Sequence, residues 1–89
     1  MLTAFFMAYT VYIIYSETRD KYYVGHTKDI QDSLFCHNNS GSKYTRGVKD
    51  WVLVYKEEFG SRSDAMKREK EIKKKKSRKY IERLITNEN

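Results

Sequence analysis

The chain has 89 residues, 39% of them hydrophobic and 34% charged, which is enough for one domain with a modest core and too little for two. Eighteen lysines and arginines against twelve aspartates and glutamates give a net charge of +6, which favours polyanionic partners such as nucleic acid or an anionic membrane surface. Cys36 is the only cysteine, which excludes an internal disulfide and the ligand spacings of a structural zinc site.

The apolar first fifteen residues have the pattern of neither a membrane span nor a signal peptide. Polar side chains such as Thr3 and Thr10 interrupt the stretch, and it contains no basic leader and no small-residue cleavage site. With the single cysteine, this predicts a cytoplasmic protein. We expect residues 1–8 to form a partly disordered N-terminal extension. Because Met7 directly precedes the first strand, one interpretation is that residues 1–6 arise from an upstream start codon.

The first predicted elements are two strands joined as a hairpin. β-Branched and aromatic residues dominate residues 9–16 and alternate between two faces. One face carries Val11, Ile13 and Tyr15, and the other carries Tyr12 and Ile14. Residues 17–20 are polar and turn-like, and the strand pattern returns at residues 21–25. The hairpin would make Tyr12 and Tyr23 near neighbours.

A helix is predicted after this hairpin. Thr27 or Asp29 can cap it, and apolar residues recur at four-residue spacing until residues 38–41, whose composition is typical of a helix end. His37 therefore lies close to the end of this helix.

The second half of the chain predicts one strand and two helices. Residues 42–50 have turn composition, and residues 51–57 alternate as a third strand. Ser61 with Asp64 resembles a capping box that opens a helix over residues 62–74. A last apolar stripe consists of Tyr80, Ile81, Leu84 and Ile85. The expected fold is α+β, a small three-stranded antiparallel sheet flanked by helices in the order β-β-α-β-α-α. One domain would cover residues 9–86, followed by a tail over 87–89.

Glu69 is an unusual residue on the helix predicted for residues 62–74. With about 100° per residue, Glu69 lies about 40° from Ala65 and within the apolar stripe, whereas Glu71 falls among the lysines. A carboxylate on a core-facing stripe is costly to bury unless it is paired, protonated or bound to a metal. Glu69 is therefore the better functional candidate. The alternative is a glutamate at the edge of the stripe that reaches water.

Five segments taken together resemble the GIY-YIG nuclease family. In chain order they are Thr10-Val11-Tyr12, Tyr23-Val24-Gly25, the helix ending in His37-Asn38, residues 42–47 and the helical residues 68–73. Either tripeptide alone is weak evidence, but the order and spacing of all five identify a family. The resemblance spans residues 9–85 and is to the small stand-alone bacterial members.

The resemblance implies a role for individual residues. Tyr12 would lie near the attacking water, Tyr23 would orient the phosphate and water, and His37 would hydrogen-bond within the tyrosine network. Glu69 would hold a single divalent cation, usually Mg²⁺, with Mn²⁺ as a substitute. Gly25 would let the backbone turn tightly into the loop before the helix. A hard cation can work with one glutamate when substrate phosphate and water complete its coordination shell.

The chain departs from the family pattern on its first helix. The family has an arginine four residues before the histidine, and Ser33 stands here. Serine offers one hydroxyl and no charge, so it cannot replace a bidentate guanidinium on the scissile phosphate. Lys28, Lys43 and Arg46 are candidates to supply that charge.

A basic segment runs from Lys67 to Lys79, with nine lysines or arginines in thirteen positions. Such a run is usually a solvated helix face. Beside the predicted site it would also contact phosphates without reading bases. The predicted nucleic-acid contacts are Lys28, Lys43, Arg46, Lys70, Lys73 and Lys74. Because no aromatic residues are interleaved in the run, it does not by itself indicate a stacking surface for single strands.

Two functions follow from these observations. The first is a metal-dependent endonuclease that hydrolyses phosphodiester bonds in DNA, on branched or damaged structures and so in repair, with Tyr12, Tyr23, His37 and Glu69 as its catalytic set. The second is a nucleic-acid-binding module on the same scaffold, impaired in catalysis by Ser33. A membrane-surface protein is the weaker third interpretation, because the cationic helix lacks large aromatic or leucine residues opposite its charges. Tyr44 remains undecided, and His26 has no assigned role.

Overall fold

The computed structural model describes residues 8–39 and 44–87. In this part of the chain three strands form one antiparallel sheet and three helices pack against it, so the predicted α+β fold and its element order are confirmed. The elements are β1 (Tyr9–Ser16), β2 (Lys21–Thr27), α1 (Ile30–Asn39), β3 (Trp51–Phe59), α2 (Arg62–Lys75) and α3 (Arg78–Thr86). The expected extension up to residue 7, Lys43 and the last two residues of the expected tail lie outside the described residues.

The strand order is β2-β1-β3, so β1 is the central strand and receives hydrogen bonds from both neighbours. Tyr12 pairs with Gly25 on β2 and with Lys56 on β3. The ladder to β3 shifts register after Ile13, which is an irregularity of the β-bulge type. This order makes β2 an edge strand that carries Tyr23.

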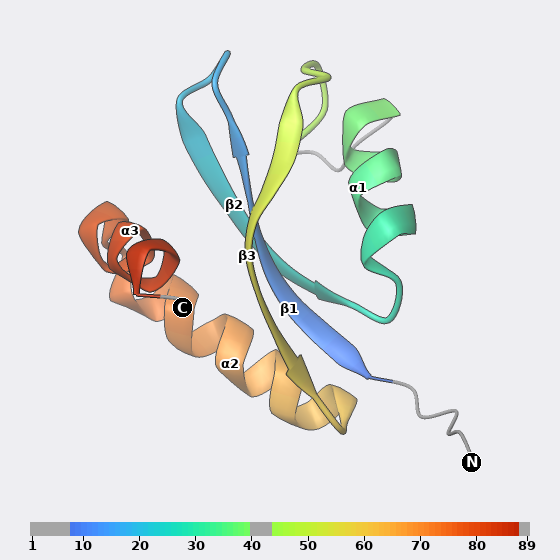
Figure 1. Cartoon of the computed structure of the whole chain (residues 1–89), viewed down its shortest axis with the longest axis vertical. Helices are drawn as coiled ribbons and strands as arrows, with labels where there is room; N and C mark the ends of the chain where they lie inside the picture. Colours follow the sequence, from blue (N-terminus) through green and yellow to red (C-terminus); the bar gives the residue numbers. More distant parts are fainter. Residues whose placement is uncertain (1–7, 40–43, 88–89) are drawn as a thin grey trace.

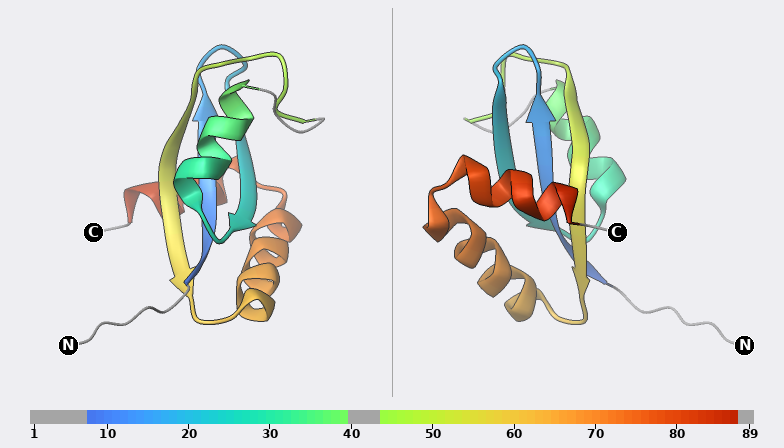
Figure 2. Two further views of the ribbon diagram at one scale, coloured as in Figure 1. Left: turned by 90° about the vertical axis from the view of Figure 1, so that its right-hand side faces the viewer. Right: turned by 60° about the vertical axis from the view of Figure 1, so that its left-hand side comes forward.

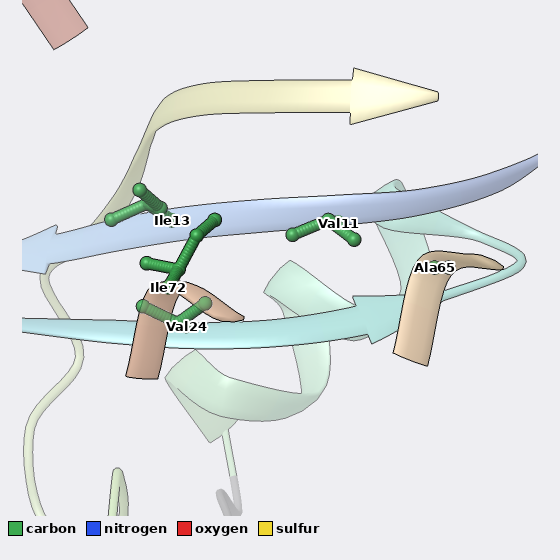
Figure 3. Packing of buried hydrophobic residues seen from close by; sticks show 5 residues of the cluster. All are labelled: Val11, Ile13, Val24, Ala65 and Ile72. Carbon is green, nitrogen blue, oxygen red and sulfur yellow. The ribbon is translucent and has the colours of Figure 1, made fainter. Parts of the chain in front are cut away.

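The helices cover the two faces of the sheet (Figures 1 and 2): α1 packs on one face, and α2 and α3 pack on the other. The buried core towards α2 consists of Val11, Ile13, Val24, Ala65 and Ile72 (Figure 3). The core towards α1 consists of Tyr12, Ile14 and Trp51. The alternation predicted for residues 9–16 therefore separates two cores, and Tyr12 belongs to the α1 side.

Helix α1 is fixed at both ends. At its start the carboxylate of Asp29 accepts a hydrogen bond from the amide of Asp32 at 3.0 Å, which satisfies one of the free N–H groups of the first turn. At its end the Asn38 side chain donates to the Trp51 carbonyl (3.0 Å) and accepts from the Trp51 amide (2.7 Å). Because Asn38 is tied to β3, the preceding residue, His37, is directed at the sheet.

Helix α2 begins as the sequence predicts, since the Ser61 side chain accepts from the Asp64 amide at 3.1 Å. On its outer side Arg68 donates from Nε and Nη2 to the Glu57 carboxylate of β3, with each distance between 3.0 and 3.2 Å. The helix ends at Lys75 and is capped by Lys76, which has a left-handed backbone (φ 47°) and donates its amide to the Lys73 carbonyl. This turn starts the change of direction into α3.

The expected role of Gly25 as a tight turn is wrong. Gly25 lies inside β2, and Gly47 is the only glycine with positive φ among the described residues. A side chain at position 25 would collide with Tyr12, because an added Cβ would lie 2.7 Å from Tyr12 Oη and 2.9 Å from its Cζ. Glycine is needed here for space and not for backbone freedom. Within residues 8–39 and 44–87, no helix is long and apolar enough to cross a membrane.

Candidate active site

A hydrogen-bonded chain of three side chains lies on the α1 side of the sheet. The Tyr12 hydroxyl is 2.8 Å from His37 Nε2, and His37 Nδ1 is 2.8 Å from the Thr45 hydroxyl. Tyr12 comes from the central strand and His37 from the last turn of α1, and both are buried, at 4% and 9% exposure. The Trp51 indole donates to the Thr45 carbonyl at 3.0 Å, which secures the outer end of the chain.

The second predicted tyrosine lies beside this chain. The Tyr23 ring centroid is 4.9 Å from that of His37 and 6.4 Å from that of Tyr12. Both tyrosine rings approach the backbone of Gly25, whose missing Cβ leaves room for them. The Tyr44 ring adds a further neighbour, 5.6 Å from Tyr23. The structure therefore brings Tyr12, Tyr23 and His37 together and adds Tyr44.

Burial moves the pKa values of Tyr12 and His37 in opposite directions. It raises the pKa of Tyr12 far above its ordinary value, with further increases from Tyr23 and the negative charge of Glu69, and it lowers the pKa of His37. At neutral pH the phenol is protonated and the imidazole is neutral. Moving the phenol proton onto the imidazole is therefore strongly uphill, so this hydrogen bond orients Tyr12 and does not exchange its proton.

Glu69 lies on α2 with 17% of its side chain exposed, so it does not simply extend into water. Its Oε1 is 2.5 Å from His26 Nδ1, and its Oε2 accepts from Lys73 Nζ at 2.6 Å. Burial raises the pKa of Glu69, but the hydrogen bonds from Lys73 and His26 outweigh it and the pKa is lowered. Glu69 is therefore an ionised, partly buried carboxylate at neutral pH.

Two links connect Glu69 to the tyrosines. Lys73 Nζ, which binds Glu69, also lies 5.7 Å from the Tyr23 ring centroid. The charge of Glu69 also contributes to the raised pKa of Tyr12. Glu71, the glutamate that the helical wheel separates from the stripe, is 60% exposed and pairs with Arg68 instead.

His26 is a site residue that sequence reasoning missed. It follows Gly25 on β2 and shares the α2 side of the strand with Val24. A signal was present in the pattern, because strand alternation puts His26 on a core-facing side opposite a helix that carries Glu69 on its own core-facing stripe. Two polar side chains that point into the same core are expected to form a hydrogen bond with each other.

Glu69 suits a hard divalent cation as a single protein ligand. Among residues 8–39 and 44–87, no three histidine, cysteine, aspartate or glutamate side chains gather to hold a metal by themselves. Mg²⁺ needs no such cluster, since it keeps several waters and binds through one or two carboxylates and substrate phosphate. The ionised Glu69 meets that requirement. A cation there would compete with Lys73 for Oε2.

Ser33 lies close to a cationic hollow. Its hydroxyl donates to Thr27 Oγ1 at 2.7 Å, and Thr27 lines a hollow of about 240 Å³. The other residues lining it are Tyr9, His26, Lys28 and Arg62. Lys28, named from the sequence, therefore lies beside the position of the missing arginine, and Arg62 of α2 is a cation that the sequence did not indicate.

The described residues among the remaining predicted nucleic-acid contacts are on the surface. Lys70, Lys74 and Arg46 are exposed, and Lys43 lies outside the described residues. The Arg46 carbonyl accepts a hydrogen bond from Arg19 at 2.6 Å, which fixes the backbone there. Lys73 differs from the others because its ammonium is bound to Glu69.

The α+β fold, with Tyr12, Tyr23 and His37 packed together on one side of the sheet, agrees with the family that the motifs indicate. Residues 8–81 match the family model of the GIY-YIG catalytic domain, and the chain belongs to this family of nucleases. The family resemblance found in the motifs is therefore confirmed.

The similar proteins are also small chains. A UPF0213 protein of Streptococcus pneumoniae is 37% identical over 84 residues, which are 92% of this chain and 85% of that protein. A UPF0213 protein of Staphylococcus saprophyticus is 48% identical over 52 residues, which are 57% of this chain and 63% of that protein, less than two thirds of its length. The solution NMR structure of the UPF0213 protein BH0048 from Bacillus halodurans has a TM-score of 0.58 at 34% identity, covering 92% of this chain and 86% of that one.

Proposed function

We propose that this chain is a metal-dependent endonuclease that hydrolyses phosphodiester bonds in DNA. Tyr12, Tyr23, His37 and Glu69 would carry the reaction, with Mg²⁺ or Mn²⁺ as the cation. The observation that carries the proposal is the 2.8 Å contact between the Tyr12 hydroxyl and His37 Nε2 beside Tyr23, linked through Lys73 to an ionised Glu69.

Tyr12 acts in this proposal as a neutral hydroxyl. Its raised pKa means that it is not a phenolate at neutral pH, and the neutral His37 holds its hydroxyl in one direction. A fixed hydroxyl can hold an attacking water in line with the phosphorus atom, and positioning of this kind lowers the barrier substantially. Tyr23, on the edge strand, would then contact a non-bridging phosphate oxygen.

Glu69 would hold the cation, whose chemistry is to increase the acidity of a bound water and to neutralise charge developing on the phosphate. Lys73, whose ammonium binds Glu69 at 2.6 Å, would then be free to contact a phosphate oxygen instead. The cation and the Lys73 ammonium would together supply positive charge next to the phosphate before hydrolysis begins.

DNA is the proposed substrate because cations surround the site. Lys28 and Arg62 line the hollow beside Ser33, and Lys70 and Lys74 are exposed on the helix that carries Glu69. Branched or damaged DNA, and hence repair, is the substrate class that we favour. The cytoplasm, where a lone cysteine stays reduced, is the proposed compartment.

The alternative function is a nucleic-acid-binding module with little or no catalysis. The observation that favours it is the Ser33 hydroxyl, which binds Thr27 and offers no charge where the family has an arginine. In that case the cationic surface would bind DNA, and Glu69 with His26 and Lys73 would be a structural ion cluster.

The decisive experiment incubates the purified protein with plasmid and branched DNA, with and without Mg²⁺, and compares Glu69→Gln with Glu71→Gln. The two substitutions remove the same charge from the same helix, but Glu71 is exposed and pairs with Arg68 instead of Lys73 and His26. The endonuclease predicts Mg²⁺-dependent cutting that Glu69→Gln abolishes and Glu71→Gln preserves. Salt-sensitive binding without cutting in any of the three proteins would establish the alternative.

A further inference from the structure

A groove next to the candidate active site combines aromatic, apolar and cationic side chains. Its volume is about 420 Å³, within the usual range for small-molecule sites. Its lining comes from the edge strand β2, from Tyr44 and from the α2–α3 junction. The residues are Tyr22, Tyr23, Val24, Tyr44, Ile72, Lys73, Lys76, Ser77 and Ile81. Tyr23 and Lys73 belong to both this groove and the candidate active site.

Tyr44 is a large aromatic residue that packing alone does not explain. It is 52% exposed, yet its ring lies 5.6 Å from Tyr23 along the groove. Its backbone is held, because Arg19 donates to the Tyr44 carbonyl at 2.9 Å and the next residue, Thr45, is buried. Because the backbone under this solvent-facing ring is held, little backbone freedom is lost when a flat ligand stacks on the ring.

Lys76 gives a second, independent indication. It has φ 47° at the end of α2, a conformation in which glycine is the usual residue and a lysine is strained. The residue in this conformation is a lysine, and it lines the groove. Lys73, whose ammonium lies 5.7 Å from the Tyr23 ring centroid, and Lys76 both line the groove with the tyrosines, a combination that matches a planar ring attached to a phosphate.

We propose that this groove binds an unpaired nucleobase next to the scissile phosphate, stacked on Tyr44, with Lys76 at the adjoining phosphate. A base inside a continuous duplex would first have to be unstacked and unpaired at an energetic cost, so the preferred substrate has an unpaired strand at the cut, such as a flap, fork or gap. The aromatic residues come from β2 and Tyr44, which explains why the basic segment alone did not indicate stacking. This inference rests on the proposed function.

The test uses the protein in EDTA, where binding is read without cutting. A forked DNA carries 2-aminopurine at an unpaired position beside the junction, and a continuous duplex of the same sequence serves as its reference. We expect a change in 2-aminopurine fluorescence on binding the fork. Tyr44→Ala should remove that change and weaken fork binding about tenfold or more, while duplex binding changes less than twofold. Tyr44→Phe, which keeps the ring, should behave like the unmodified protein.

Two controls separate stacking from simple loss of a surface ring or charge. Phe35→Ala removes an aromatic side chain that is 65% exposed and does not line the groove, and it should leave fork binding unchanged. Lys76→Gly should raise the melting temperature by relieving the strained φ, and should still weaken fork binding. Lys49→Ala, an exposed lysine outside the groove, provides the charge control.

Equal loss of fork and duplex binding in Tyr44→Ala would overturn the proposal, because the groove would then only follow the phosphate backbone. Unchanged fork binding in Tyr44→Ala would also overturn it. Because all measurements are made without metal, absence of Mg²⁺-dependent cutting would refute the nuclease and leave the groove result standing.

Discussion

The phenol of Tyr12 lies directly over Gly25, its partner across the β1–β2 ladder, and occupies the space that a side chain would take. In Gly25→Ala the new methyl group would lie 2.7 Å from Tyr12 Oη, which is too close, so the Tyr12 ring should be displaced. We expect a loss of stability of about 1–3 kcal/mol from overpacking and a fall in kcat of about 10²-fold from misplacement of the hydroxyl. Chemical denaturation and cleavage rates measure the two effects.

Gly60→Ala is the matched control for this substitution. An added Cβ at Gly60 meets nothing within 4 Å, so this variant should keep full activity and change stability by less than about 1 kcal/mol. Equal activity in the two variants would show that the close approach of Tyr12 to Gly25 does not matter for catalysis.

The buried imidazole of His37 predicts how stability changes in mild acid. Burial lowers its pKa, so the unfolded chain binds a proton at higher pH than the folded protein does. The contribution of the neutral His37 to the stability of the fold is fully present above about pH 6.5, the ordinary histidine pKa. It declines as the pH falls from there through the lowered pKa of the folded protein. NMR titration should give a His37 midpoint below 6.5, and urea unfolding between pH 7 and 5 should show a shallower decline in His37→Gln. A His37 midpoint above 6.5 would contradict this prediction.

The contact between Glu57 and Arg68 should add stability that acid removes. Burial raises the pKa of Glu57, but hydrogen bonds from Arg68 and Tyr55 outweigh it, so the folded-state pKa is lowered. This contribution is present at neutral pH and is lost as the pH falls through that lowered value. Glu57→Gln should cost about 1–2 kcal/mol at pH 7, and the difference should shrink below about pH 4.

Glu58→Gln is the comparison for that measurement. Its pair with Lys56 is longer, at 3.8 Å, and both side chains are at least half exposed, so the change should stay below about 0.5 kcal/mol. If the free energy of unfolding falls by the same amount in the two variants, the closer contact with Arg68 does not stabilise the fold.

Restoring the family arginine should increase cutting. Ser33→Arg places a guanidinium beside the hollow lined by Lys28 and Arg62, at the cost of the hydrogen bond to Thr27. We expect the Mg²⁺-dependent rate to rise about tenfold or more, because a fixed cation stabilises charge on the phosphate in the transition state. Single-turnover cleavage of branched DNA measures it. Gln31→Arg adds the same charge to the exposed side of α1, and an equal gain there would mean that only general attraction had increased.

The sequence predicted the elements because each has a local signal. Alternation in residues 9–16 separates the two cores, and Ser61 with Asp64 marks the start of α2. The strand order was not predictable in the same way, since no local pattern says which strand lies in the centre. For the site, motif order indicated Tyr12 and His37, which the structure joins by a hydrogen bond.

The contacts that escaped prediction join segments far apart in the chain. His26 meets Glu69 across 43 positions, and Arg19 holds the Tyr44 carbonyl across 25. Such pairs depend on how α2 and the segment after α1 pack against the β1–β2 hairpin. The sequence gives the face on which a side chain such as His26 lies, but it does not give the partner that the packing brings there. The role of Gly25 was misjudged for a similar reason, because its neighbour is the Tyr12 ring on another strand.

The position of β1 between two partners has a consequence for how activity responds to heat. Tyr12 lies on a strand that is hydrogen-bonded to a neighbour on both sides, whereas Tyr23 and His26 lie on an edge strand with a neighbour on one side. On warming, we expect the edge strand β2 to unfold locally before the central strand β1 does. Catalysis should therefore fade several degrees before the molecule melts, and return on cooling.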